Sequence, residues 1–172
     1  MIYWGKFFLL FVSVNNPKIL IYWLNMSSFQ IIVGSMLGGT EYVAEACEET
    51  LQTLGHQTNL HLQPEFKQIL TDKQTWLICT STHGAGDFPD NIQKFIEDMR
   101  FSEQNISSVK VLILGIGDSN YDTYCLAAKK IENILNSMGC NLISPLKTLD
   151  MREDIDPEAL AQQWIIELQD LL

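Results

Sequence analysis

The sequence lacks the features of several common functional classes. Lys and Arg are few, 11 against 21 Asp and Glu, and the net charge of −10 argues against nucleic acid or an anionic membrane surface as partner. A basic protein partner is the natural complement of this charge. There is also no C-x-x-C pair. The widely spaced Cys47, Cys79, Cys125 and Cys140 fit neither a zinc nor a disulfide pattern, and predict reduced thiols in a cytoplasmic protein.

No apolar run is long enough to cross a bilayer. Residues 1–25 are rich in aromatic side chains, but their apolar runs, 7–14 and 19–24, are short and are separated by Asn15-Asn16-Pro17-Lys18. No small-residue cleavage site follows, which argues against a signal peptide. We interpret residues 1–26 as an appended apolar segment arising from a mis-assigned start, with a membrane-contacting arm as the alternative. Residues 27–172 then form a single domain, expected to be monomeric.

The most informative stretch is the loop 34–41, Gly-Ser-Met-Leu-Gly-Gly-Thr-Glu, between an apolar run at 29–33 and an amphipathic run at 41–54. A strand, a glycine-bearing loop and a helix N-terminus together hold anions, and Ser35 and Thr40 add hydroxyls. A nucleotide-hydrolysing P-loop has Lys and then Ser or Thr after its second glycine, whereas Thr40 and Glu41 follow Gly39 here. The glycines are also not spaced as G-x-G-x-x-G. The loop therefore predicts a monophosphate site, with a glycine-rich turn that binds nothing as the alternative.

Strand and helix patterns alternate along the rest of the chain. We expect five strands, at 30–33, 57–62, 75–80, 109–116 and 141–143. We also expect helices at 42–54 and 124–138, a helix that is capped by Asp90 or Asn91 and ends near residue 99, and a final helix that begins at Pro157. Five strands alternating with helices predict an α/β fold with a doubly wound, five-stranded parallel sheet. The right-handed crossover rule and the short chain favour the strand order 2-1-3-4-5.

Unusual residues follow the first, third and fourth predicted strands. In such a sheet, ligands bind beyond the carboxyl ends of the strands, near the point between the first and third strands where the strand order reverses. The second loop contains Ser81-Thr82-His83-Gly84, and the third contains Gly117-Asp118-Ser119-Asn120-Tyr121. Each of these loops has glycines that let the backbone approach a flat ligand, and His83 and Tyr121 offer rings for stacking. A phosphate loop beside two ring-bearing loops predicts a flavin mononucleotide (FMN) site.

At these three loops the chain resembles the flavodoxin family, most of all the MioC-type short flavodoxins, over essentially all of residues 27–172. The loop 81–91 is also similar to that of the FMN domains of diflavin reductases. The resemblance implies a flavodoxin-like sheet, stacking of Tyr121 on the flavin, and no bound metal. The FMN contacts that it implies are Ser35, Met36, Leu37, Gly38, Gly39, Thr40, Ser81, Thr82, His83, Gly84, Gly117, Asp118, Ser119, Tyr121 and Cys125.

Three positions depart from the family pattern. Met36 and Leu37 stand where flavodoxins usually have hydroxyl residues, so the phosphate must depend on backbone N–H groups and FMN affinity should be modest. His83 stands where an aromatic ring is common, and its protonation would make the flavin potential depend on pH. The alternative for His83 is a hydrogen bond within its own loop.

These observations predict an electron-transfer protein rather than an enzyme. We expect an FMN-binding one-electron carrier that takes electrons from a basic-faced, NADPH-dependent reductase of the flavodoxin or ferredoxin type. The resemblance implies biotin synthase as the acceptor, and hence a role in biotin biosynthesis. Acidic residues near the loops should lower the flavin potential and steer basic partners; the candidates are Asp87, Asp90, Glu97, Asp98, Asp118 and Asp122. The alternatives are an FMN-dependent NAD(P)H reductase of quinones or azo compounds, and an interaction module without flavin.

Overall fold

The computed structural model describes residues 26–172. Residues 1–26 were interpreted above as an appended segment. All of them except Met26 lie outside the described range, so this interpretation stays a prediction. The centre of the molecule is a parallel sheet in the order β2-β1-β3-β4-β5, which confirms the predicted order. Its strands are β1 (Ser28–Gly34), β2 (Gln57–His61), β3 (Gln74–Thr80), β4 (Lys110–Gly117), β5 (Asn141–Leu142) and β6 (Lys147–Asp150).

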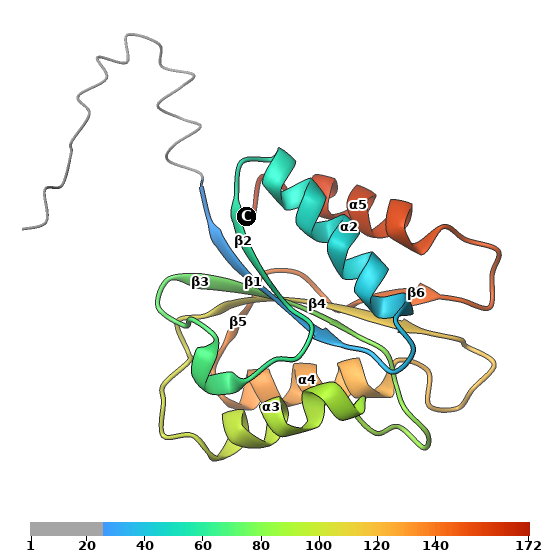
Figure 1. Cartoon of the computed structure of the whole chain (residues 1–172), viewed down its shortest axis with the longest axis horizontal. Coiled ribbons are helices and arrows are strands. Elements are labelled where there is room, and N and C mark those ends of the chain that lie inside the picture. The colour runs from blue at the N-terminus through green and yellow to red at the C-terminus, as the bar shows by residue number, and fades with distance from the viewer. Residues whose placement is uncertain (1–25) are drawn as a thin grey trace, which may run out of the picture.

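Helices cover both faces of the sheet (Figure 1). One face carries α2 (Gly39–Thr53) and α5 (Pro157–Glu167), and the other carries α3 (Asp90–Phe101) and α4 (Leu126–Ser137). A short 3-10 helix, η1 (Phe66–Gln68), lies between β2 and β3 in the chain. Each helix described within residues 26–172 is too short or too polar to cross a membrane.

The central strands are buried on both faces, which is why they read as continuous apolar runs. Along β1, Phe29 and Ile31 belong to the apolar cluster under α2 and α5, whereas Ile32 belongs to the cluster under α3 and α4. Trp76 is fully buried in the second cluster, and its Nε1 donates a hydrogen bond to the Leu70 carbonyl at 2.9 Å. The two clusters hold the sheet rigidly, so the loops at its carboxyl edge have a fixed platform.

The final strand differs from its predicted form. The pattern predicts one strand at 141–143, but two short strands, β5 and β6, both pair with β4. The four residues 143–146 bulge out between these two strands. Leu142 pairs with Val111 of β4, and Lys147 pairs with Leu114 of the same strand. Pro145 lies in this bulge and has no N–H to donate to a ladder. As a result, β6 carries Asp150 and Met151 to the carboxyl edge of the sheet.

The start of α3 also differs from the prediction. Neither Asp90 nor Asn91 caps this helix, because α3 already begins at Asp90 and is preceded by Pro89 without a side-chain cap. The Asn91 side chain is engaged elsewhere. It forms hydrogen bonds with the end of β1, with the residue that follows it, and with the segment after β2. The cap prediction was therefore wrong, since tertiary contacts claim this amide.

Candidate functional site

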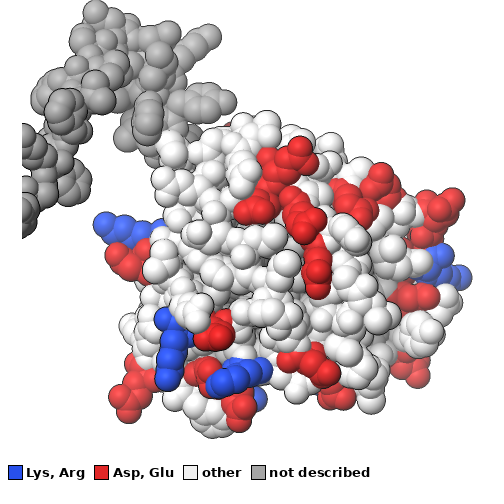
Figure 2. Space-filling view, viewed as in Figure 1, with Lys and Arg blue, Asp and Glu red and all other residues white. Residues whose placement is uncertain are grey.

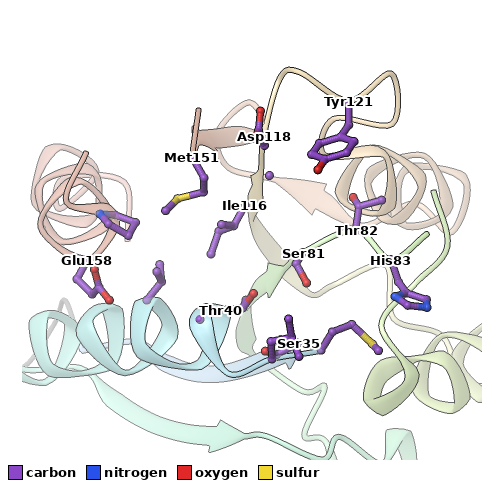
Figure 3. A pocket seen from close by; sticks show the side chains of 16 residues that line it. Ser35, Thr40, Ser81, Thr82, His83, Ile116, Asp118, Tyr121, Met151 and Glu158 are labelled. Atoms are coloured by element: carbon purple, nitrogen blue, oxygen red, sulfur yellow. The ribbon is translucent and has the colours of Figure 1, made fainter. Parts of the chain in front are cut away.

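The three predicted loops meet around one cavity of about 700 Å³ at the carboxyl ends of β1, β3 and β4 (Figure 3). Most of the residues predicted to contact FMN line it, and they come from all three loops. They are Ser35, Met36, Leu37, Gly39, Thr40, Ser81, Thr82, His83, Gly117, Asp118 and Tyr121. The position agrees with the rule that ligands of doubly wound sheets bind at this edge.

The first loop turns directly into α2. Gly38 is the residue before the helix and has a φ of +90°, a backbone conformation that residues with a side chain rarely adopt. Its N–H donates to Ser35 Oγ at 3.1 Å, which closes the loop on itself. Ser35 and Thr40 are both buried at the base of the loop, whereas Leu37 is 98% exposed. The loop therefore presents backbone, rather than large side chains, to its base.

The donors of this loop fit a phosphate group. Within residues 26–172, no hydrogen bond joins the backbone N–H of Met36, Leu37, Gly39 or Thr40 to another protein atom. The N–H groups of Gly39 and Thr40 lie in the first turn of α2, where the helix dipole favours an anion. With the two buried hydroxyls, these groups can hold phosphate oxygens without any Lys or Arg.

The second loop is held in place by backbone pairing and by α4. The N–H of His83 donates to the Asp87 carbonyl at 2.9 Å, and the N–H of Asp87 donates to the His83 carbonyl at 2.8 Å. Thr82 Oγ1 accepts a hydrogen bond from Ala127 N–H at 3.1 Å, and Lys130 Nζ donates to the Gly86 carbonyl. These bonds use the backbone of His83, so its exposed ring is left to line the cavity.

The third loop presents an exposed tyrosine. Asp118 Oδ1 accepts a hydrogen bond from Asn120 N–H at 2.8 Å, and the Asp118 carbonyl accepts one from Tyr121 N–H at 3.1 Å. The tight turn leaves the Tyr121 side chain 68% exposed. Figure 3 shows Tyr121 and His83 at the same end of the cavity, one from each loop. Two rings at one end and a phosphate-type loop at its base suit a flat, phosphorylated ligand.

A smaller hollow of about 310 Å³ adjoins the cavity and includes two further predicted residues, Gly84 and Cys125. Burial raises the pKa of the Cys125 thiol to about 11, so this side chain is a neutral thiol at pH 7. The remaining two predicted residues, Gly38 and Ser119, line neither hollow. Gly38 shapes the first loop, and the N–H of Ser119 donates to Asp150 Oδ1.

Five lining residues were missed by the sequence predictions: Val43, Ile116, Met151, Pro157 and Glu158. Met151 follows β6, so recognition of that strand would have placed it at the carboxyl edge with the three loops. Pro157 and Glu158 begin α5, which lies beside α2 (Figure 1). Figure 3 shows Met151 and Glu158 toward the opposite end of the cavity from His83.

The cysteines and other metal-type ligands form no centre in the part of the chain that the structure describes. Cys47, Cys79, Cys125 and Cys140 are all buried free thiols. The Cys79 thiol has a pKa well above its ordinary value because of a hydrogen bond with Cys47 and burial. Residues 26–172 contain no group of three or more His, Cys, Asp or Glu placed to hold a metal ion.

Comparison with known proteins gives a consistent result. Residues 31–164 match the family model described as flavodoxin. The chain is 38% identical over 135 residues to a MioC homolog of Pasteurella multocida, covering 78% of this chain and 91% of the relative. It is 36% identical over 140 residues to the MioC protein of Escherichia coli K12, covering 81% and 95%. The solved structure of a mutant flavodoxin from Pseudomonas aeruginosa superposes with a TM-score of 0.78 at 26% identity, covering 84% of this chain and 98% of that one.

Proposed function

The chain belongs to the flavodoxin family, and from this premise we propose that it carries single electrons on FMN bound in the three-loop cavity. Flavodoxins are FMN-binding electron-transfer proteins rather than enzymes, and this chain is a MioC-like member. One observation carries the assignment of the cavity. A loop with four backbone N–H groups that have no partner within residues 26–172 meets two loops that bear His83 and Tyr121. We propose residues 27–172 as the functional unit.

In this proposal the first loop binds the phosphate, while the second and third loops orient the flavin ring. Bound FMN supplies the one-electron redox chemistry. Thr82 and Gly117 line both hollows, and their backbone would contact the ring and its ribityl chain when FMN is bound. Ile116 and Val43 are buried apolar side chains of the cavity wall and exclude water from the inner part of the ligand. Exposure of Tyr121 leaves one edge of the site open for electron exchange.

Carboxylates near the site oppose added negative charge on the flavin. Asp118 and Glu158 line the cavity, and Lys and Arg are absent from its lining within the described residues. Asp118, on the loop that carries Tyr121, places negative charge near the ring end of the cavity, whereas Glu158 lies toward the opposite end. Negative charge near the ring makes an anionic reduced state less favourable, so we expect a low reduction potential. In this proposal Asp118 therefore has the electrostatic role that the sequence analysis predicted for it.

A basic reductase and an acceptor enzyme are the proposed partners. The helices α2 and α5 hold six Glu residues and no Lys or Arg, whereas α3 and α4 hold four acidic and four basic residues. Figure 2 shows acidic side chains lined up over the α2 face. Because α2 begins at the first loop, a basic partner steered to this face arrives beside the cavity. We propose an NADPH-dependent reductase as donor, and biotin synthase as the acceptor that the MioC-type resemblance suggests.

We further propose that the protein works as a monomer. We also propose that it works in the cytoplasm, because four free thiols suit a reducing compartment.

Asp98, one of the predicted steering residues, forms an ion pair with Lys94 at 2.8 Å, so its charge is partly offset. The steering surface in this proposal therefore centres on α2, with Asp87, Asp118 and Asp122 on the neighbouring loops.

The test is stepwise anaerobic reduction of the full chain with its absorbance recorded. We expect an oxidised flavin spectrum that is lost in two one-electron steps. NADPH alone should leave the spectrum unchanged, and NADPH with a catalytic amount of flavodoxin reductase should reduce it. Rapid reduction by NADPH alone would contradict the carrier assignment and favour the reductase alternative. A colourless protein that does not bind added FMN would favour the interaction module.

A further inference from the structure

The side chain of Asn91 connects three separate segments beside the first loop. Its Oδ1 accepts a hydrogen bond from Ser35 N–H at 3.0 Å, and its Nδ2 donates to the carbonyls of Val33 and Leu62, each at 2.8 Å. Both N–H bonds of the amide are thus used, and the residue is half-buried at the start of α3. Asn91 therefore holds the end of β1, the start of the loop and the segment after β2 in one arrangement.

This arrangement decides the direction of the loop backbone. The N–H of Ser35 points to Asn91 rather than into the cavity, and Ser35 Oγ is then placed to accept from Gly38 N–H at 3.1 Å. With these two N–H groups occupied, four others in the loop stay unused within the described chain; they are those of Met36, Leu37, Gly39 and Thr40. Asn91 itself does not line the cavity.

A second contact joins the same end of α3 to the loop. The backbone N–H of Asp90, in the first turn of α3, approaches Met36 Sδ at 3.4 Å. A thioether is a weak acceptor, so this contact contributes less than the three amide bonds. It nevertheless places the sulfur of Met36, a residue that departs from the family pattern and lines the cavity, next to the start of α3.

We propose that Asn91 is a positioning residue for the phosphate-binding loop, and that it determines how much the phosphate group contributes to ligand affinity. This inference rests on the proposed binding of FMN. A loop that is already held in its binding shape loses little conformational entropy when phosphate binds. Without Asn91, Ser35 N–H and two carbonyls lose their partner, and the loop must be ordered by the ligand itself.

The experiment compares FMN with riboflavin, which lacks the phosphate. Apoprotein of the full chain is titrated with each flavin, and binding is followed by quenching of flavin fluorescence. For Asn91→Ala we expect FMN affinity to fall by at least about ten-fold, while riboflavin affinity changes by less than about two-fold. Purely structural damage would weaken both flavins by the same factor, so the ratio of the two affinities isolates the loop.

Gln93→Ala is the matched control. Gln93 is an amide on the same helix whose Nε2 donates to the Phe88 carbonyl at 3.0 Å and to Asp90 Oδ1 at 3.1 Å, without reaching the loop. Its removal should leave the ratio unchanged. The uncharged, similarly sized Asn91→Leu provides a second variant if Asn91→Ala does not fold, because it loses the acceptor for Ser35 N–H and both donors without adding a charge beside the phosphate. The 31P resonance of bound FMN should shift in Asn91→Leu and not in Gln93→Ala.

The outcomes separate the two proposals. If the unmodified protein binds FMN and the Asn91 variants keep the same FMN-to-riboflavin ratio and the same 31P resonance, the positioning role is wrong and the carrier proposal stands. If the unmodified apoprotein binds neither flavin, the carrier proposal fails and this inference fails with it. A lowered ratio in the Asn91 variants alone supports the positioning role.

Discussion

Asp150 Oδ1 accepts a hydrogen bond from the backbone N–H of Ser119 at 2.9 Å, although the two residues are 31 positions apart. Next to this bond, the N–H of Met151 donates to the Gly117 carbonyl at 2.7 Å. The end of β6 therefore fastens the third loop, which carries Tyr121. The hydrogen bonds from Ser119 lower the pKa of Asp150, since they stabilise its charged form.

This shift predicts a specific dependence of stability on pH. A carboxyl group whose pKa is lower in the folded state stabilises the fold above its ordinary pKa of 3.8, and the effect is lost as pH falls through the folded value. Asp150→Asn keeps the acceptor oxygen and removes the charge. We expect this variant to be less stable than the unmodified protein at about pH 6, and the difference to shrink as the pH falls below 3.8 toward the lower pKa of the folded state. Urea unfolding at several pH values measures it, and a difference that persists undiminished in acid would contradict the interpretation.

Gly38 should be far more sensitive to substitution than its neighbour. Gly38 has φ of +90°, whereas Gly39 has no such φ, and a Cβ at either position meets nothing within 4 Å. Gly38→Ala must adopt a left-handed conformation, so the free energy of unfolding should fall by about 1–2 kcal/mol. Gly39→Ala is the control and should lose less than about 0.5 kcal/mol, because Ala is favoured over Gly in a helix. Equal losses in urea unfolding would show that backbone conformation is not the cause.

Two tyrosines of similar exposure should behave differently toward flavin. Tyr121 is 68% exposed and lines the cavity, whereas Tyr42 is 64% exposed on α2 and lies outside the lining. Loss of ring stacking in Tyr121→Ala should weaken FMN binding by about three- to ten-fold, measured by titration of the apoprotein. Tyr42→Ala should bind FMN like the unmodified protein. An equal effect of both substitutions would remove Tyr121 from the proposed site.

The charge of α2 should control the encounter with a basic reductase. Glu45 is exposed on α2, and Glu45→Lys should slow reduction of the bound flavin by about three-fold at low ionic strength, with the difference lost at about 0.5 M NaCl. Glu132→Lys makes the same change of charge on α4, in the electrically balanced layer, and should have a smaller effect. Stopped-flow absorbance gives both rates. Equal slowing by the two variants would indicate that net charge, rather than the α2 face, steers the partner.

Much of the fold could be predicted because its central strands carry strong local patterns. The apolar runs of β1, β3 and β4 are buried on both faces, and each is followed by a loop with glycines and polar residues. β6 escaped prediction because Lys147–Asp150 is short and largely half-buried, and it gains its partners only after the chain bulges at Pro145. Met151 and Glu158 were missed for the same reason, since their place in the cavity depends on how β6 and α5 pack.

Local patterns were enough to predict the parallel sheet, the order of its five main strands and the three loops at its carboxyl edge, because apolar periodicity and glycine-bearing turns act over a few neighbouring residues. The sequence also indicated most of the residues that line the cavity. Which backbone donors of the first loop lack a partner within residues 26–172 depends instead on tertiary packing. Asn91 looks locally like a helix cap, but it binds Ser35 N–H across 56 positions of the chain. Such a bond depends on which segments the packed sheet brings together, and no local pattern in the sequence records it.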